Sequence, residues 1–202
     1  MQTNSRKRIV YLARIAILGA VAAVLMIFEF PLLIIAPAFY EMDFSEIPVL
    51  IGAFSMGPIA GILTELIKVV LNLVITGTST AFVGEIANFL VGCALVVPAG
   101  LIYKKYRSKS GALVSMLCGT IFMSLIAFFL NAYFLIPFFS RFYGLPLNAI
   151  VAMGHEIFPI IDSVPELAAF CVVPFNFVKG LAVSVITFLL YKHIHKLLNK
   201  IH

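Results

Sequence analysis

Long apolar runs separated by short polar stretches dominate this chain of 202 residues. A helix needs about 20 apolar residues to cross the hydrocarbon of a bilayer, so runs of this length predict membrane-spanning helices. The apolar run at 46–76 is too long for one ordinary span, and the Gly and Pro of "SMGPIAG" (55–61) predict a break into two helices. The expected helices cover about 9–28, 46–55, 58–76, 82–103, 111–137 and 168–191.

Composition supports the same fold class. Hydrophobic residues make up 62% of the chain and charged residues only 11%, a balance that water-soluble domains of this size do not have. We therefore expect an all-α integral membrane protein, with residues 1–202 forming a single domain of six transmembrane helices. Two long external loops are expected at about 29–45 and 138–167.

The distribution of positive charge predicts the orientation in the membrane. Eleven of the fourteen Lys and Arg residues fall in three clusters: Arg6, Lys7, Arg8 and Arg14; Lys104, Lys105, Arg107 and Lys109; Lys192, Lys196 and Lys200. Six helices with the N-terminus inside place all three clusters in the cytoplasm, as the positive-inside rule requires. The net charge of +5 thus reports topology in a multi-pass membrane protein, not a nucleic-acid partner.

Two polar side chains interrupt the last apolar run, "CVVPFNFVKGLAVSVITFLL" (171–190). Lys179 lies 13 residues before Lys192, about 20 Å along a helix, which is too deep for its amine to reach the inner surface. Asn176 lies three residues earlier, on the same face. A Lys–Glu bridge that only holds helices together is the structural alternative, but the neighbouring amide favours a ligand-binding notch.

Other embedded polar groups follow the same logic. Glu65 and Lys68 are spaced i, i+3 and are expected to form a structural ion pair. Glu85 and Asn88 share one face of the helix that follows the "TGTST" turn, and this polar stripe predicts a cavity that opens outward. Asn131 lies among aromatic residues, and an amide with aromatic rings suits a planar heterocycle.

The first helix carries small residues four apart, a spacing that permits close helix contact in a bilayer. These residues are Ala16, Gly19, Ala20 and Ala23.

Several function classes lack their motifs. The sequence contains no P-loop, no H-E-x-x-H and no G-x-S-x-G, so an enzyme is disfavoured. The three cysteines are far apart in apolar runs and predict neither a disulfide framework nor a metal site. A channel needs a pore lined along its whole length, whereas the embedded charges here lie mid-membrane or toward the outside. The pattern predicts a blind pocket that opens outward.

Two segments together, "DFSEIPVLIGAFSMGPIAGILTELIKVVLNLVITGTSTAFVGEIANFLVG" (43–92) and "PFNFVKG" (174–180), resemble the riboflavin-specific substrate-binding subunits, or S components, of energy-coupling factor (ECF) transporters. The resemblance extends over essentially the whole chain. It implies an S-component fold that binds its vitamin from outside, with no cofactor. It also implies partners, a transmembrane T subunit and two ABC ATPases.

The resemblance further implies roles for individual residues. Asn176 and Lys179 match the motif that hydrogen-bonds flavin, the loop from Tyr40 to Asp43 closes over the pocket, and Ala16 and Ala20 match the surface that docks the T subunit. The expected ligand-binding set is Tyr40, Asp43, Thr80, Ala81, Glu85, Asn88, Asn131, Asn176 and Lys179.

Two alternatives remain open at this point. One keeps the family but changes the cargo to flavin mononucleotide (FMN) or another vitamin, although a phosphate would want more external cations than Arg141 and Lys179. The other is a self-contained secondary transporter in which Glu65, Glu85 and Lys179 relay protons.

Overall fold

The computed structural model describes the backbone of residues 2–199 and the side chains of residues 5–190, so the side chains of the last basic cluster lie outside the described part. Five helices are long and apolar enough to cross a membrane, within the ranges Ser5–Ile27, Pro58–Thr76, Val83–Lys105, Lys109–Tyr143 and Val164–Leu190. The principal helices of these ranges are α1 (Gln2–Ile27), α3 (Pro58–Thr76), α4 (Val83–Lys105), α5 (Lys109–Leu130) and α9 (Val173–Asn199).

A sixth apolar helix, α2 (Glu46–Met56), has only 11 residues. It ends at Gly57, whose φ of 99° is a conformation that residues with a Cβ rarely adopt, and Pro58 then starts α3. Despite its length, α2 contacts α1, α3, α4 and α9. It therefore forms the centre of the helix packing.

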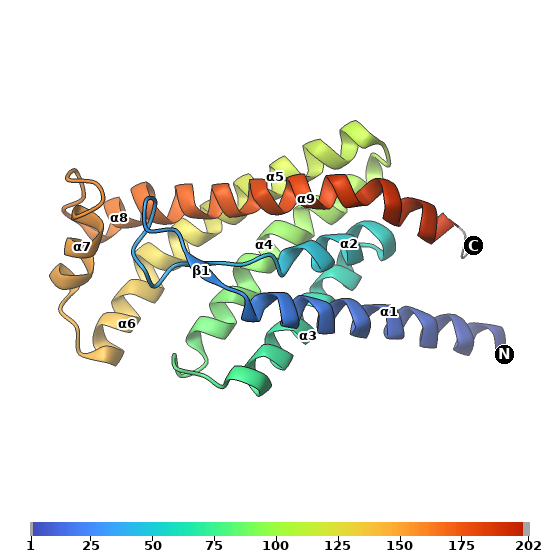
Figure 1. The fold of residues 1–202 in the computed structure, drawn as a ribbon, viewed down its shortest axis with the longest axis horizontal. Helices are drawn as coiled ribbons and strands as arrows, with labels where there is room; N and C mark the ends of the chain where they lie inside the picture. Colours follow the sequence, from blue (N-terminus) through green and yellow to red (C-terminus); the bar gives the residue numbers. More distant parts are fainter. Residues whose placement is uncertain (1, 200–202) are drawn as a thin grey trace.

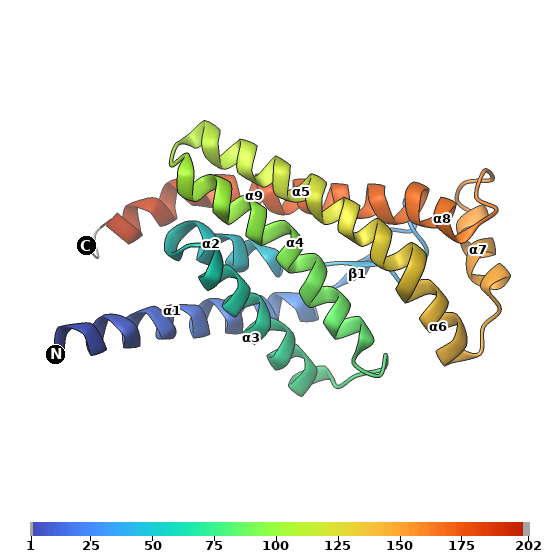
Figure 2. The ribbon, with the colours of Figure 1, turned by 180° about the vertical axis from the view of Figure 1, so that it is seen from behind.

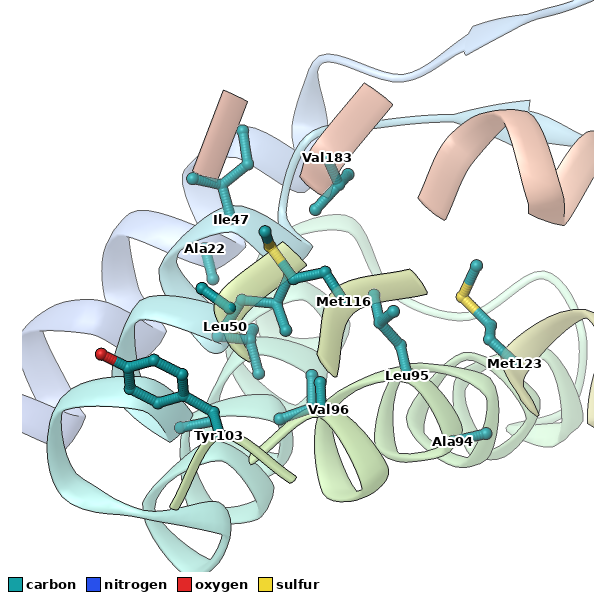
Figure 3. Packing of buried hydrophobic residues seen from close by; sticks show 14 residues of the cluster. Ala22, Ile47, Leu50, Ala94, Leu95, Val96, Tyr103, Met116, Met123 and Val183 are labelled. Atoms are coloured by element: carbon teal, nitrogen blue, oxygen red, sulfur yellow. The ribbon is translucent and has the colours of Figure 1, made fainter. Parts of the chain in front are cut away.

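The main apolar core surrounds α2 (Figure 3). Val49 and Leu50 of α2 pack with Leu95 and Val96 of α4 and with Met116 of α5, all essentially inaccessible to solvent. Figure 2 shows α4 and α5 side by side, with α3 next to α4. The helix surfaces outside this core are rich in exposed apolar side chains, as lipid contact requires.

Both termini and the α4–α5 turn lie at one end of the molecule (Figure 1). The opposite end, called the outer end below, carries α6 (Ile136–Tyr143), α7 (Leu147–His155) and α8 (Val164–Leu167). The segment expected as a long external loop at about 138–167 thus contains short helices. The helix that begins at Lys109 continues to Tyr143 and stops at Gly144, which adopts the left-handed conformation of a helix C-terminus.

Two π-helical turns interrupt the long helices near the outer end. These are η1 (Asn131–Leu135), between α5 and α6, and η2 (Ala168–Val172), between α8 and α9. Each starts six residues before a proline, Pro137 or Pro174. Since proline has no N–H to donate, the wider turn takes its bond from the preceding residue: Ile136 N–H donates to Asn131 O, and Val173 N–H to Ala168 O.

The connection between α1 and α2 forms a short hairpin at the outer end. Strand β1 (Phe30–Pro31) pairs antiparallel with β2 (Glu41–Met42), with Phe30 opposite Met42. Met42 is buried in a second apolar cluster with Leu167, Cys171 and Phe175. The hairpin is thereby fixed against η2 and the start of α9.

Candidate ligand-binding site

An ion pair joins the hairpin to the last helix. Lys179 Nζ, on α9, donates to Asp43 Oδ2 at 2.7 Å, and the two residues keep only 8% and 2% of their surface accessible. Asp43 Oδ1 accepts the backbone N–H of Ser45 at 2.7 Å, just before α2 begins. Two residues expected from the sequence to bind ligand thus meet across 136 positions of the chain.

Charge keeps Asp43 ionised although it is buried. Burial by itself raises the pKa of a carboxyl. The positive charge of Lys179, and to a smaller extent that of Lys68, outweighs this effect and holds the pKa of Asp43 below its ordinary value. The pair is therefore a true carboxylate–ammonium contact. It leaves Lys179 with part of its hydrogen-bonding capacity and no uncompensated charge.

A second link connects the hairpin to η1. Tyr40 OH donates to Asn131 Oδ1 at 2.8 Å, and the ring of Tyr40 lies 5.8 Å from that of Phe175 on α9. Tyr40 also packs against a buried cluster formed by Ala127 of α5, Ala132 of η1, and Ala168 and Val172 of η2. Its side chain thus lies where α5, η1, η2 and the start of α9 approach one another.

The two embedded amides are held in the same way. Asn131 Nδ2 donates to Ala127 O at 2.8 Å, and Asn176 Nδ2 donates to Val172 O at 2.9 Å, each one turn back along its own helix. Asn131 is the first residue of η1 and Val172 is the last residue of η2, and η1 contacts η2. Since π turns widen a helix and often occur at functional sites, these two bring the expected amides to a common region.

The turn between α3 and α4 forms a separate polar group. Thr80 Oγ1 donates to Glu85 Oε2 at 2.8 Å and accepts the N–H of Gly84 at 3.1 Å, which caps the first turn of α4. Ala81 is exposed and has a positive φ of 51°. Within the described residues, no hydrogen bond or ion pair connects this turn to Lys179 or Asn176.

Asn88, one turn further along α4, is partly buried, and its Oδ1 accepts no hydrogen bond from any described group. Of the expected ligand-binding residues, the structure therefore brings Tyr40, Asp43, Asn131 and Lys179 into direct pairs. Thr80 and Glu85 are engaged with each other.

Lys68 belongs to a fully enclosed three-residue cluster. Its Nζ lies 2.8 Å from Glu65 Oε1, the expected partner, and 2.7 Å from Glu46 Oε1 on α2. Sequence reasoning missed Glu46. Glu46 could have been identified from the sequence, because a carboxylate at the start of so apolar a helix needs either solvent or a cation as its partner.

A glycine on α4 makes room for this cluster. A Cβ at Gly92 would lie 2.2 Å from Glu65 Oε1 and 3.0 Å from Glu46 Oε1. Only a residue without a side chain lets α4 approach both carboxylates. The cluster is consequently a packing centre among α2, α3 and α4, with no room for a ligand.

The small residues of α1 separate onto two faces. Ala16 and Ala20 are exposed, whereas Ala23 is fully buried and Gly19 faces α3, where a Cβ would lie 2.5 Å from Ile67 Cγ2. Of the four small residues expected to dock a partner, Gly19 and Ala23 are thus covered by this chain itself, and Gly19 packs α1 against α3.

Redox and metal chemistry have few groups available. The described residues contain no cluster of three or more His, Cys, Asp or Glu that could hold a metal ion, and Cys93, Cys118 and Cys171 are free thiols. The site offers instead hydrogen-bonding amides, a phenol, one ion pair and aromatic rings. Such groups suit the binding of a planar, hydrogen-bonding solute.

Comparison with known proteins is consistent with this chemistry. Residues 10–191 match the family described as "ECF transporter, substrate-specific component". The "Riboflavin transporter RibU" of Staphylococcus aureus (strain TCH60) is 31% identical over 201 residues, which cover 100% of this chain and 96% of that protein. The "Riboflavin transporter FmnP" of Bacillus subtilis (strain 168) is 32% identical, with 88% and 87% covered.

A solved structure gives the same result for the fold. It is described as "Structure and mechanism of the S component of a bacterial ECF transporter" and superimposes with a TM-score of 0.73 at 31% sequence identity. The alignment covers 95% of this chain and 98% of that one.

Proposed function

This chain belongs to the family of substrate-specific components of ECF transporters, and from that premise we propose that it binds riboflavin from outside the cell. It is a transport subunit, not an enzyme, and a multi-pass protein of the bacterial cell membrane. We further propose that it hands the vitamin to the cytoplasm in association with a transmembrane T subunit and two ABC ATPases.

One observation carries the binding proposal. Polar groups from three segments far apart in the sequence converge at the outer end, where Tyr40 meets Asn131 and Asp43 meets Lys179. The hairpin supplies the first member of each pair, and helices supply the second. Because such pairs exchange partners at little cost, their polar atoms are suited to switch from each other to a hydrogen-bonding ligand.

The charge of the site favours a neutral flavin over its phosphate ester. Asp43 already compensates Lys179, so a phosphate entering here would meet a carboxylate as well as an ammonium. Arg141, on α6, is the other cation at the outer end. We therefore propose riboflavin as the principal ligand and FMN as a weaker one.

For orientation, we propose six crossings, with α2 as a short sixth, and both termini in the cytoplasm. The placement of the basic α4–α5 turn at the same end as the termini supports this (Figure 1). We propose that the exposed residues Ala16 and Ala20 form part of the face that meets the T subunit.

A secondary transporter would need its ionisable groups on an accessible path. Glu65 and Lys68 have no accessible surface and are paired with each other and with Glu46. Their enclosure supports the S-component function over a proton relay.

The deciding experiment purifies the chain alone in lipid nanodiscs and titrates it with riboflavin, following the quenching of flavin fluorescence. Tight binding is expected, without sustained uptake when the same protein is reconstituted in vesicles. Accumulation driven by a pH gradient in the absence of any ATPase would contradict the proposal. Failure of the folded protein to bind riboflavin would refute the assignment of the ligand.

A further inference from the structure

A hollow lies at the end of the bundle opposite the hairpin (Figure 1). It has a volume of about 220 Å³ and lies between Tyr11 of α1, the α2–α3 corner and the last turn of α4. Lys104 and Arg107 line it, together with backbone at Gly57. None of the residues expected to bind the vitamin lies on its wall.

Among the residues whose side chains the structure describes, no salt bridge joins Lys104 or Arg107 to a carboxylate. The nine Asp and Glu residues all lie within residues 29–166, and none occurs between Glu85 and Glu156. The turn that carries Lys104 and Arg107 therefore has no acidic neighbour in sequence, and no acidic residue lines the cavity. Both side chains are exposed, so an anion from outside the protein can reach them.

The other walls of the hollow are apolar and aromatic. Phe54 and Tyr103 stack with ring centroids 4.4 Å apart, and Met56 and Pro58 also line the space. Ile59, at the rim, keeps 68% of its surface exposed in a region that faces lipid. Such a mixture suits a phosphate ester that carries an apolar portion better than it suits a free, fully hydrated ion.

We propose that this cavity binds the phosphate head group of an acidic phospholipid from the leaflet at this end of the bundle. Lys104 and Arg107 contact the phosphate, the Tyr11 hydroxyl offers a further donor, and the lipid's glycerol and upper acyl chains lie against the apolar rim. A guanidinium is well suited to phosphate because it can donate two parallel hydrogen bonds.

The chain provides a matched control for the two cations. Lys105 and Lys109 carry the same charge in the same turn, but neither lines the cavity, and Lys105 Nζ lies over the ring of Tyr106, 5.4 Å from its centroid. Neutralising Lys104 and Arg107 (K104Q/R107Q) or Lys105 and Lys109 (K105Q/K109Q) removes the same net charge. A general attraction to an anionic surface would weaken equally in both double variants.

The test measures retention of phosphatidylglycerol by the full chain, using native mass spectrometry and competition in phosphatidylcholine nanodiscs. K104Q/R107Q is expected to lose affinity for phosphatidylglycerol by about 30-fold, as two lost surface cations imply, while K105Q/K109Q changes it little. Equal losses in the two double variants would overturn the proposal. Thermal unfolding of each variant in phosphatidylcholine alone verifies that both are folded.

Two further experiments distinguish the phospholipid from other possible occupants of the hollow. Inorganic phosphate at millimolar concentration is expected not to displace phosphatidylglycerol; displacement would mean a site for free phosphate and would overturn the lipid assignment. If K104Q/R107Q retains phosphatidylglycerol but no longer assembles with the T subunit and ATPases, the hollow is a protein-docking site instead. These readouts do not use riboflavin, so they stand independently of the vitamin proposal.

Discussion

Among the described side chains, two lysines are buried, and each meets a carboxylate from residues 43–46, at the start of α2. Lys179 pairs with Asp43 one to one, near the outer surface, and retains slight exposure. Lys68 meets two carboxylates, Glu46 and Glu65, and has none. One pair connects a loop to a helix, whereas the other cluster connects two helices, α2 and α3, at the point where Gly92 of α4 approaches them.

The difference indicates which buried charge is available for function. A cation enclosed by packed helices can only support the fold, because nothing can approach it without separating those helices. A cation that meets a loop can exchange its partner when the loop moves. The binding site and the structural cluster are therefore distinguished by whether the carboxylate that meets the lysine lies on a loop or on a packed helix, and not by the depth of the lysine alone.

The largest effect is expected from replacing the enclosed lysine. Lys68→Met leaves Glu46 and Glu65 facing each other without a cation, and loss of one partner in a buried ion pair costs about 3–5 kcal/mol. Thermal unfolding in detergent should show a large loss of stability or failure to fold. Lys179→Met is the matched substitution, and equal destabilisation by both would remove the distinction between the two sites.

A smaller loss of stability is expected for Gly92→Ala. The new methyl group would overlap Glu65 Oε1, and overpacking a filled interior costs about 1–3 kcal/mol. The same substitution made together with Glu65→Ala should cost less, because the overlapping carboxylate is gone. A double-mutant cycle measures this coupling, and strict additivity would mean that Gly92 does not make room for the cluster.

Lys179→Met should act mainly on binding. We expect riboflavin affinity to fall more than tenfold, the loss equivalent to about 1.4 kcal/mol, as one charge-assisted hydrogen bond disappears. Titration by flavin fluorescence measures it, and Asn176→Ala should behave similarly. Unchanged affinity in folded protein would exclude the residue from the site.

The smallest effect is a pH dependence confined to the hairpin. Partial desolvation of its carboxyl, followed by the charge of Glu41, raises the pKa of Glu29 to about 7 from 4.5, although the residue is exposed at the surface. Between pH 4.5 and 7, Glu29 ionises more readily in the unfolded loop than in the folded one. The hairpin therefore loses stability as the pH rises through this range. Asp43 acts oppositely: its lowered pKa gives stability that disappears only as the solution becomes strongly acidic.

Hydrogen exchange of residues 28–45, corrected for the intrinsic rate, should therefore be faster at pH 8 than at pH 5. Glu29→Gln is expected to abolish this difference, since the amide does not titrate. A pH dependence that persists in the variant would contradict the assignment to Glu29. Exchange in the middle of α3, around the Lys68 cluster, should not change between these pH values.

Depth along an apolar helix was enough to predict that Lys179, Asn176 and Asn131 are special, because hydrocarbon penalises polar groups. Depth could not identify Asp43 as the partner of Lys179, since 136 residues separate them and only folding brings them together. The prediction from depth also missed Glu46. Its helix is short, so its position in the membrane could not be inferred from the length of an apolar run.

Spacing had a similar limit on α1. A repeat of small residues every four positions occurs on two faces of that helix, and both satisfy the pattern equally. Which face meets α3 is decided by the fit of Gly19 against the side chain of Ile67, 48 positions further along the chain. The structure leaves Ala16 and Ala20 on the outside, where a partner can reach them.

The π turns have a consequence for insertions and deletions. Each accommodates one residue more than an α-helical turn, so the helix that follows is rotated by about 100° relative to an uninterrupted helix. Deleting one residue within 168–172 would leave an unbroken apolar helix of nearly the same length and hydropathy. Its two halves would nevertheless change phase, so that Asn176 and Lys179 could no longer face the hairpin while α8 kept its contacts. The position of a single residue, invisible in composition, thus sets the relative angular positions of the two ends of the binding helix.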